Sequence, residues 1–438
     1  MISDQAKLDR AESDQVGSDQ VGSDQVGSDQ VEIVLLSNGP GELYTWAGPM
    51  LRELRAQAPD VRISLGLLPC PFASGHEERI AKGLGFDAIS SVSESLAFIA
   101  GGPKPAAFAK RPNGLVIGLG GDVSFPGRIG SRLGYPAWRY SFEPYWKDGL
   151  EKLFVHDQRT LEKARKSGPQ NKLGNRLENI GNLTADALAF QTPAPKLPGL
   201  DVLIMPGSRK FEVEHMLGVF AASAEQIAEK MTQTVPGPIR FHWPRSRLLT
   251  EAMLEVARSG KKVLDLGGVA TRLEVDFLIT PNGTRIYVAD EADRYALMKM
   301  CDLALTIPGT NTLELGIANC PSIVALPLQK SELIPIENPL RYLEHIPVFG
   351  PRIKRRLVEI FLSRFKHVSL PNMIADEAIQ LELRGDVTPE LIASHASKLL
   401  ESPSELARIR SRLNATMPQA GTAKKLVARA LERVGLNA

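Results

Sequence analysis

The stretch LALTIPGTNTLEL, residues 303–315, decides how the rest of the chain is interpreted. Its apolar first half predicts a buried strand, and Pro308-Gly309 marks a turn directly after that strand. We expect a helix to begin at Thr310 or Asn311, either of which can cap it. A helix start presents unpaired N–H groups and a partial positive charge, which suit a phosphate. An ordinary capped turn between a strand and a helix explains the stretch equally well on its own.

Short apolar segments, each followed by a turn and a helical segment, recur along the chain. They predict one series of strands at residues 32–36, 61–68, 115–119, 137–140 and 152–155, and a second at 201–205, 240–243, 285–288, 303–307 and 322–326. Such alternation is typical of parallel sheets with helices on both faces. A proline-rich linker, residues 192–198, separates the two series. The sequence therefore predicts an α/β protein with two doubly wound, Rossmann-like domains facing a cleft.

Composition and pattern divide the chain into four predicted segments. Residues 1–30 contain a tandem SDQVG repeat, which has too few apolar side chains to form a core and is expected to be a disordered tail. Residues 31–195 are assigned to the first domain and residues 196–410 to the second. Residues 411–438 are expected to form a C-terminal helix that packs across the domains.

The composition is typical of a soluble globular protein, since 43% of the residues are hydrophobic and 23% are charged. A formal net charge of +2 over 438 residues gives no basic excess, so nucleic acid is not expected as a partner. Cys70, Cys301 and Cys320 are far apart, which argues against a disulfide framework and predicts a reducing, cytoplasmic compartment. No apolar run is long enough to span a bilayer. The histidines show no paired spacing and HExxH is absent, so we expect no metal site and no bound cofactor.

Two turns of the second domain are suited to holding an anion. In PGSRKFEVE, residues 206–214, backbone donors again lie at a helix start, and Arg209 supplies a charge-assisted fork for a diphosphate. A capped helix with a surface arginine is the alternative for this segment. Glu314, in the first turn of the later helix, is expected to face outward and bind a ribose diol. Two such turns favour a nucleotide diphosphate, and its predicted contacts are Ser208, Arg209, Glu212, Gly309, Thr310, Asn311, Thr312 and Glu314.

The first predicted strand runs into another glycine-rich turn, SNGPGE, residues 37–42. This turn lacks the spaced glycines of a dinucleotide-binding fingerprint, so NAD is not expected. Because it follows the first parallel strand, it should still border the ligand crevice. The residues assigned to this loop are Asn38, Gly39, Gly41 and Glu42.

Several of these segments resemble the lipid-A-disaccharide synthase family. Residues 305–328 are similar to the family's donor-site stretch, and PGSRxxEV is similar to the opening of its second domain. ENIGN, residues 178–182, with Asp186 downstream, resembles the family's crossover between domains. HVSLPN resembles its ISLPN segment, which adds Asn372 to the donor-side residues. These matches keep their order along the chain.

The resemblance implies a glycosyltransferase fold with two Rossmann domains, called GT-B, and a UDP-sugar donor that is usually used without a metal. It also implies that the first-domain loop faces the acceptor and that the second domain binds the nucleotide sugar. The chain departs from the family's GExSGD and SGT patterns, where it has SNGPGE and PGT. It also carries an apparent insertion between Leu328 and His367.

An inverting sugar transfer requires a general base that deprotonates the acceptor hydroxyl as this hydroxyl attacks the anomeric carbon. Asp122 is the candidate, because GGDVSF closes the turn after a buried strand and resembles the family's DAPDFN loop. Glu42 is the rival base. A helix cap before Phe125 is the alternative role for Asp122.

Residues 351–366 combine a basic cluster with an apolar stripe at helical spacing. The basic residues are Arg352, Lys354, Arg355 and Arg356, and the apolar ones are Leu357, Ile360, Phe361 and Phe365. A basic amphipathic helix suits an anionic membrane surface, although a solvated helix packed on its own domain is equally common.

We therefore predict an inverting glycosyltransferase that moves a sugar, of the N-acetylglucosamine type, from a UDP donor to a membrane lipid or lipid-linked sugar. The predicted location is the cytoplasmic, inner face of a membrane, to which the protein binds peripherally. A UDP-sugar epimerase of the same fold and a non-catalytic membrane-associated relative are the alternatives. A homodimer is left open.

Overall fold

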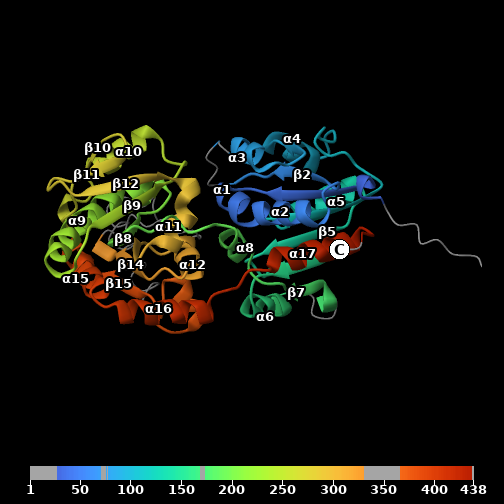
Figure 1. Ribbon diagram of the computed structural model, residues 1–438. Helices are drawn as coiled ribbons and strands as arrows, with labels where there is room; N and C mark the ends of the chain where they lie inside the picture. Colours follow the sequence, from blue (N-terminus) through green and yellow to red (C-terminus); the bar gives the residue numbers. More distant parts are fainter. Residues whose placement is uncertain (1–26, 71–74, 76, 168–172, 330–365, 437–438) are drawn as a thin grey trace, which may run out of the picture.

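The computed structural model describes residues 27–70, 75, 77–167, 173–329 and 366–436 (Figure 1). Two α/β bodies lie side by side, each built on its own sheet, and the strand arrows of the first body point toward the second. The predicted class of two doubly wound, Rossmann-like domains is confirmed. Of the predicted disordered tail, residues 1–26 lie outside the described residues, and Ser28–Gln30 forms a single 3-10 turn, η1.

Within the described residues, the first sheet contains seven parallel strands in the order β3-β2-β1-β4-β5-β6-β7. They are β1 Val31–Ser37, β2 Arg62–Leu67, β3 Ala88–Ser90, β4 Asn113–Leu119, β5 Ala137–Ser141, β6 Lys152–Val155 and β7 Leu177–Asn179. The strand order reverses between β1 and β4. The turns after these two strands therefore lie side by side at the carboxyl edge of the sheet, where open α/β sheets bind ligands.

Strand β1 is apolar along most of its length because both of its faces are covered. Ile33 and Leu35 belong to the core on one face of the sheet, and Val34 and Leu36 belong to the core on the other. Helices cover these faces: α1 Pro40–Glu42, α2 Gly48–Gln57, α3 Glu77–Leu84, α4 Val92–Ile99, α5 Phe125–Leu133, α6 Gln158–Ser167 and α8 Leu183–Ala189. A π-helical turn, η2 Leu43–Ala47, joins α1 to α2, and a 3-10 turn, η3 Gly174–Arg176, precedes β7.

The second sheet contains eight strands in the order β10-β11-β12-β9-β8-β13-β14-β15, counted over the described residues. They are β8 Leu200–Met205, β9 Ile239–Arg245, β10 Arg272–Leu273, β11 Phe277–Ile279, β12 Arg285–Asp290, β13 Leu303–Thr306, β14 Ser322–Pro327 and β15 Leu381–Gly385. The strands from β12 to β15 in this order are parallel. Beyond β12, β11 pairs antiparallel with β12 and β10 pairs antiparallel with β11, which corrects the expectation of a purely parallel sheet. Asn282-Gly283 lies in the β11–β12 turn, and this pair is a common hairpin signal.

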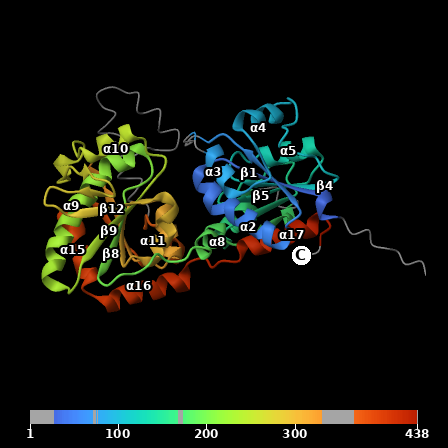
Figure 2. The same cartoon turned by 45° about the horizontal axis from the view of Figure 1, so that its top comes forward.

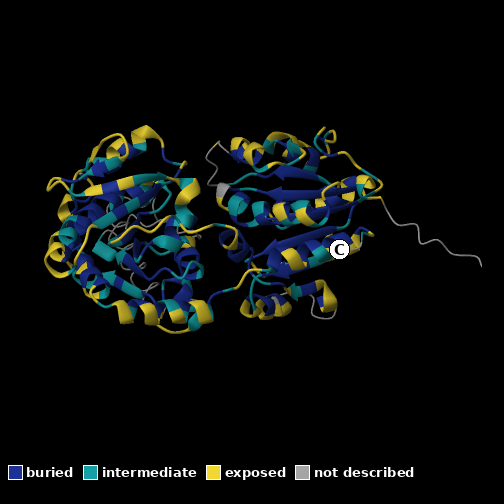
Figure 3. Ribbon diagram, viewed as in Figure 1, coloured by how far each residue is buried: buried dark blue, intermediate teal, exposed yellow. Residues whose placement is uncertain are grey.

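The helices of the second domain are α9 Lys210–Thr234, α10 Glu251–Arg258, α11 Arg294–Met300, α12 Thr310–Ile317, α14 Leu370–Ala375, α15 Pro389–Leu400 and α16 Pro403–Thr416. Two 3-10 turns, η4 Leu264–Leu266 and η5 Glu291–Asp293, complete it. Its largest core packs α9 and α15 against the sheet. Figure 3 shows the first sheet as mainly buried, whereas the β10–β12 edge of the second sheet and the outer sides of the helices carry exposed residues.

The last helix, α17 Thr422–Arg433, returns to the first domain (Figure 2). Leu426, Val427 and Leu431 belong to the first-domain core beside α2. The buried carboxylate of Asp186 in α8 accepts hydrogen bonds from the backbone N–H groups of Gly421 (2.7 Å) and Thr422 (3.1 Å) at the start of α17. The segment predicted as one helix from 411 to 438 is therefore the end of α16, a crossing segment and α17.

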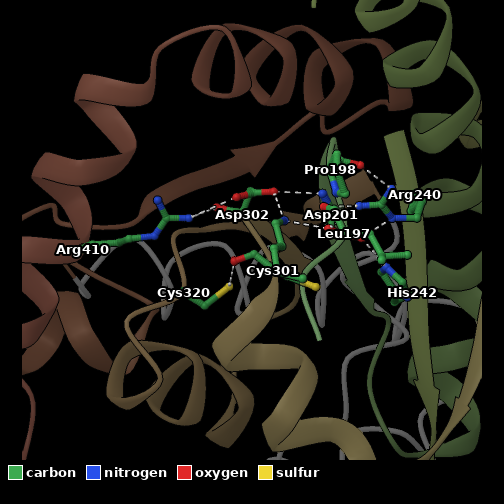
Figure 4. Close-up of polar contacts among 10 residues, drawn as sticks. Leu197, Pro198, Asp201, Arg240, His242, Cys301, Asp302, Cys320 and Arg410 are labelled. Atoms are coloured by element: carbon green, nitrogen blue, oxygen red, sulfur yellow. Dashed lines mark hydrogen bonds and ion pairs between the residues drawn. The ribbon is translucent and has the colours of Figure 1, made fainter. Parts of the chain in front are cut away.

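A buried network of charges fixes the linker to the second sheet (Figure 4). Asp201 is only 1% exposed, at the start of β8. Its carboxylate accepts two hydrogen bonds from Arg240 (2.7 and 2.8 Å), one from Lys196 (2.6 Å) and one from His242 (2.8 Å). Arg240 also donates to two linker carbonyl groups. This network holds the linker at the amino end of the sheet, opposite the ligand-binding edge.

Candidate active site

The predicted acceptor-side loop and the loop that carries Asp122 are neighbours. They follow β1 and β4, which pair with Ser37 opposite Leu119. Gly120 has a φ of +117°, and a Cβ on it would lie 2.3 Å from Oδ1 of Asn38. The close packing of the two turns therefore requires a glycine at this position. Among the described residues, the buried Oδ1 of Asn38 has no hydrogen-bond partner.

Glu42 is half-buried where these two turns meet. A Cβ on Gly39 would lie 2.4 Å from Oε2 of Glu42, and a Cβ on Gly120 would lie 3.5 Å from its Cγ. Gly41, by contrast, is exposed with open space around its Cα. Burial raises the pKa of Glu42 above its ordinary value. A carboxylate with a raised pKa accepts a proton more readily near neutral pH, which suits a general base.

Asp122 is exposed, and its carboxylate forms hydrogen bonds within its own turn. Its Oδ1 accepts hydrogen bonds from the backbone N–H (2.8 Å) and the hydroxyl (2.5 Å) of Ser124. These bonds lower the pKa of Asp122, and the charge of Arg139 lowers it further. The geometry is that of a residue closing the turn before α5. Its low pKa makes Asp122 a weaker base than Glu42.

Arg139 on β5 is a charged residue of this region that the sequence did not single out. It is 3% exposed, and its Nη2 lies 3.3 Å from the carbonyl oxygen of Gly121 and 3.4 Å from Oε2 of Glu143. Burial lowers the pKa of Arg139. Its Nε and Nη1 have no hydrogen-bond partner within the described part of the chain. The arginine in the otherwise apolar segment AWRYS was the available signal.

The start of α12, at the position predicted from the sequence, is open to solvent. Gly309 and Thr310 are exposed, and a Cβ on Gly309 would meet no atom within 4 Å. The φ of Gly309 is +144°, which favours glycine there. The hydroxyl of Thr312 donates to the carbonyl of Gly309 (2.7 Å) and accepts from the backbone N–H of Leu370 (3.0 Å). Asn311, which is partly exposed, lies in the same first turn.

Glu314 faces inward, so its predicted outward orientation is wrong. It is 4% exposed, and its Oε1 accepts hydrogen bonds from Nη2 of Arg294 (2.9 Å) and from the hydroxyl of Tyr295 (3.1 Å). The reason is tertiary packing, because α11 places Arg294 against this face of α12. Burial raises the pKa of Glu314. Burial also disfavours the charged form of Arg294, but the neighbouring Glu314 carboxylate outweighs this effect, so the pKa of Arg294 is raised. Oε2 of Glu314 has no hydrogen-bond partner in the described residues.

The turn before α9 already contains a carboxylate. Oε2 of Glu212 accepts hydrogen bonds from the backbone N–H groups of Ser208 (2.9 Å) and Arg209 (3.0 Å). Gly207 has a φ of +108°, and a Cβ on it would lie 2.3 Å from the same oxygen. A phosphate at this turn must therefore compete with Glu212 for the backbone donors.

Asn372 in α14 is fully buried and fully bonded. Its Nδ2 donates to the carbonyl of Gln380 (2.8 Å) and to Oε1 of Glu382 (3.0 Å). Its Oδ1 accepts from the backbone N–H groups of Ile379 (2.9 Å) and Gln380 (2.8 Å). The side chain thus connects α14 to β15, and its predicted contact with a donor stays a prediction.

Arg247, after β9, connects the second domain to the Glu42 region. Its Nη1 donates to the hydroxyl of Tyr44 (3.4 Å), two residues beyond Glu42, and its Nη2 lies 2.6 Å from Oδ1 of Asp290. Its backbone N–H donates to Glu291 (2.9 Å), whose carboxylate lies 3.9 Å from the Arg294 guanidinium. A chain of polar contacts therefore runs from the first-domain turn to the base of α12.

In the described part of the chain, no cluster of His, Cys, Asp and Glu has an arrangement that would hold a metal ion. None of the helices there is long and apolar enough to cross a membrane.

The two sheets and the ligand-edge turns define a protein of the GT-B type. UDP-GlcNAc 2-epimerase from Neisseria meningitidis, solved bound to UDP-GlcNAc, superposes with a TM-score of 0.52 at 12% identity and covers 92% of this chain and 100% of that chain. This likeness shows the fold. The family model that matches is Lipid-A-disaccharide synthetase, over residues 273–431.

Curated relatives support the same family. Lipid-A-disaccharide synthase from Geobacter sulfurreducens is 24% identical over 51% of this chain and 46% of the relative. The enzyme from Geobacter metallireducens is 25% identical over 60% of this chain and 59% of the relative. The alignments thus span about half the length of the curated relatives. The resemblance predicted from the sequence is confirmed: the chain is similar, at low identity, to the lipid-A-disaccharide synthases.

Proposed function

We propose that this protein is an inverting glycosyltransferase that moves a sugar from a UDP donor to a membrane lipid or a lipid-linked sugar. The supporting observation is the placement of two groups. The half-buried carboxylate of Glu42 lies at the carboxyl edge of the first sheet, and the open start of α12 lies at the carboxyl edge of the second. The hydrogen bond between Arg247 and Tyr44 connects the two domains beside Glu42. A base from one domain and a diphosphate site from the other are what a sugar transfer between two substrates requires.

The proposed donor site lies on the second domain. The exposed N–H groups at Gly309 and Thr310 bind the diphosphate, and Arg209 adds a positive charge. These groups stabilise the negative charge that develops on the leaving UDP, so the proposed transfer needs no metal. The Glu314 carboxylate, which faces inward, supports this helix start through its hydrogen bonds with Arg294 and Tyr295.

The proposed chemical step uses Glu42 rather than Asp122 as the base. Glu42 removes the proton from the acceptor hydroxyl, whose oxygen attacks the anomeric carbon opposite the diphosphate. The bond from that carbon to UDP breaks, and UDP leaves with the bonding electron pair. Attack from the opposite face inverts the configuration of the sugar.

Donor binding provides the first prediction. Arg209→Ala and Glu314→Gln are each expected to weaken UDP binding by about 1.5–3 kcal/mol, the range for hydrogen bonds to charged groups. Glutamine retains an acceptor for Arg294 and Tyr295 but loses the carboxylate charge. Isothermal titration calorimetry with UDP measures the effect.

Glu274→Gln is the matched control for this experiment. Glu274 pairs with Arg272 at the antiparallel end of the second sheet, remote in strand order from the donor turns, and UDP affinity should not change. Thermal unfolding of each variant separates lost binding from lost folding. Unchanged UDP affinity in folded Arg209→Ala and Glu314→Gln proteins would remove the donor site from this proposal.

An epimerase of the same fold is the alternative, since a solved UDP-GlcNAc 2-epimerase shares the architecture. An epimerase exchanges the proton at C2 of the sugar without any acceptor. Incubation with labelled UDP-sugars in deuterated water, with and without a total lipid extract, separates the two activities. Label transferred to lipid supports the transferase, and C2 exchange without lipid supports the epimerase. Bound UDP without either reaction indicates a non-catalytic relative.

Membrane binding is a further prediction from the sequence, because residues 351–366 lie almost entirely outside the described residues. Each basic side chain near an anionic surface contributes about 1 kcal/mol. We expect the protein to float with anionic vesicles at low salt and to detach as salt screens the attraction. Neutralising Arg352, Lys354, Arg355 and Arg356 together should have the same effect as salt.

The control neutralises four exposed lysines elsewhere, namely Lys82, Lys166, Lys424 and Lys425. This variant has the same change in net charge and should still float. If the wild-type protein stays in the soluble fraction at low salt, the basic segment is not a membrane contact.

A further inference from the structure

An open pocket of about 770 Å³ lies beside β15 and is lined by the C-terminal half of α15 and by α16. Among the described residues that line it, none belongs to the turns after β8, β9, β12 or β13. Asn372 lines it, but the amide of Asn372 is bonded within the protein. The pocket is therefore separate from the proposed donor turns, and its volume is within the range of small-molecule sites.

Two buried polar side chains on the wall of this pocket have unused hydrogen-bonding groups. Gln380 is 1% exposed, and neither its Oε1 nor its Nε2 has a partner among the described residues. His367 is 9% exposed, and its Nε2 is likewise without one. Proteins rarely leave buried polar atoms unpaired, because their desolvation is not compensated. A carboxamide offers a donor and an acceptor side by side, so its complement is a ligand edge with an adjacent acceptor and donor.

The charged groups around the pocket favour an anion. Four basic side chains and two acidic ones line it: Lys366, Arg384, Lys398 and Arg408, with Glu382 and Glu405. Both acids are engaged, each with one of the two arginines, and Lys366 pairs with Asp376 at 3.1 Å, so the excess positive charge comes from Lys398. Glu382 accepts from two backbone N–H groups and contacts Arg384, and Glu405 accepts from Arg408 at 2.6 and 2.8 Å.

Lys398 is the basic group most available to a ligand. It is exposed on α15 and forms no ion pair with any residue that the structure describes. Between the charged rim and Gln380, the pocket has an apolar surface that includes Ile379, Leu381 and Ile409. Such a surface suits a flat ring, whose faces are apolar and whose edge is polar.

We propose that this pocket is a second small-molecule site, which binds a phosphorylated compound of the nucleoside monophosphate type. The phosphate contacts Lys398 and Arg408 at the rim, the ring packs on the apolar wall, and its donor–acceptor edge pairs with the amide of Gln380. A carboxamide pairs in this bidentate way with the edge of a nucleobase. This site is independent of the proposed sugar transfer.

Calorimetry with AMP and with UMP tests the proposal, in the presence of saturating UDP so that the donor turns are occupied. We expect one equivalent of at least one of the two nucleotides to bind. Gln380→Leu removes the pairing edge and leaves no unpaired side-chain polar atom at position 380, so the variant should fold and lose tenfold or more in affinity. Lys398→Gln should weaken binding by a similar factor and reduce its dependence on salt.

Lys424→Gln, an exposed substitution on α17, is the control and should leave nucleotide binding unchanged. UDP affinity should be the same in all three variants, and a failure of UDP to bind would count against the sugar transfer alone. Absence of heat with both nucleotides at millimolar concentration would overturn the proposal. So would binding that survives both pocket substitutions, or inorganic phosphate that binds as tightly as the nucleotides.

Discussion

Glu42→Gln is expected to reduce turnover by roughly 10²–10⁴-fold, the usual contribution of a general base. Glutamine keeps the shape of the side chain but does not accept the proton from the acceptor hydroxyl. UDP affinity should be nearly unchanged, because the donor turns belong to the other domain. Steady-state rates with a UDP-sugar and a lipid acceptor give the turnover, and calorimetry gives the affinity.

Asp122→Asn is the matched comparison for this experiment, because it makes the same chemical change on the neighbouring turn. Its carboxylate is held by Ser124 and has a lowered pKa, so we expect a much smaller loss of turnover. A large loss in Asp122→Asn together with a near-normal rate in Glu42→Gln would assign the base to Asp122.

The raised pKa of Glu42 also determines the pH dependence. The rate should fall as the pH decreases through this pKa, so the acidic limb should lie above the ordinary carboxyl value of about 4.3. The stability effect has the opposite sign: a raised pKa in the folded state means that folding favours the protonated form, and ionisation at higher pH costs stability. Glu42→Gln should therefore be at least as stable as the wild type at neutral pH, which distinguishes lost catalysis from lost folding.

Residues 303–315 show how much local sequence determines. The apolar run became β13 and the helix began at Thr310, because strand burial and the Pro-Gly turn are properties of neighbouring residues. The predicted cap by Thr310 or Asn311 is wrong, since Gly309 is the N-cap residue and no side chain in the described part of the chain caps the helix. The direction of Glu314 was not predictable in this way. Its partner, Arg294, precedes it by twenty residues on a different helix, and no local pattern indicates that α11 packs there.

The short and edge strands were missed for a related reason. β3 and β7 have three residues each, too few to show a pattern, and β15 reads LELRG, where alternating charges conceal an edge strand. The contact of Asp186 with the start of α17 joins residues 235 and 236 positions apart. Within the candidate site, the sequence identified the turns, whereas the arginines that connect them lie in segments without a distinguishing motif.

Asp201→Asn is expected to lower the free energy of unfolding by about 3 kcal/mol, the low end for breaking a buried ion pair. The carboxylate is 1% exposed and accepts hydrogen bonds from Arg240, Lys196 and His242. Asparagine leaves Arg240 and His242 without their negative partner, whereas Lys196 keeps its ion pair with Asp302 at 2.5 Å. The low end applies because Lys196 is 39% exposed and can be partly hydrated after the change. Chemical denaturation, followed by circular dichroism, measures the loss.

The pH dependence of this loss identifies its cause. Burial opposes ionisation of Asp201, but the hydrogen bonds from Arg240 and Lys196 outweigh it and hold the pKa of Asp201 well below its usual range. A lowered pKa in the folded state contributes stability that is present above the unfolded value of about 3.9 and is lost as the pH falls toward the folded pKa. The difference between wild type and Asp201→Asn should therefore be full at pH 7 and shrink below about pH 4. Asp60→Asn, at an exposed position after α2, should show no such difference at any pH. A gap between wild type and Asp201→Asn that stays constant down to pH 3 would mean that lost packing, rather than lost charge, destabilises the variant.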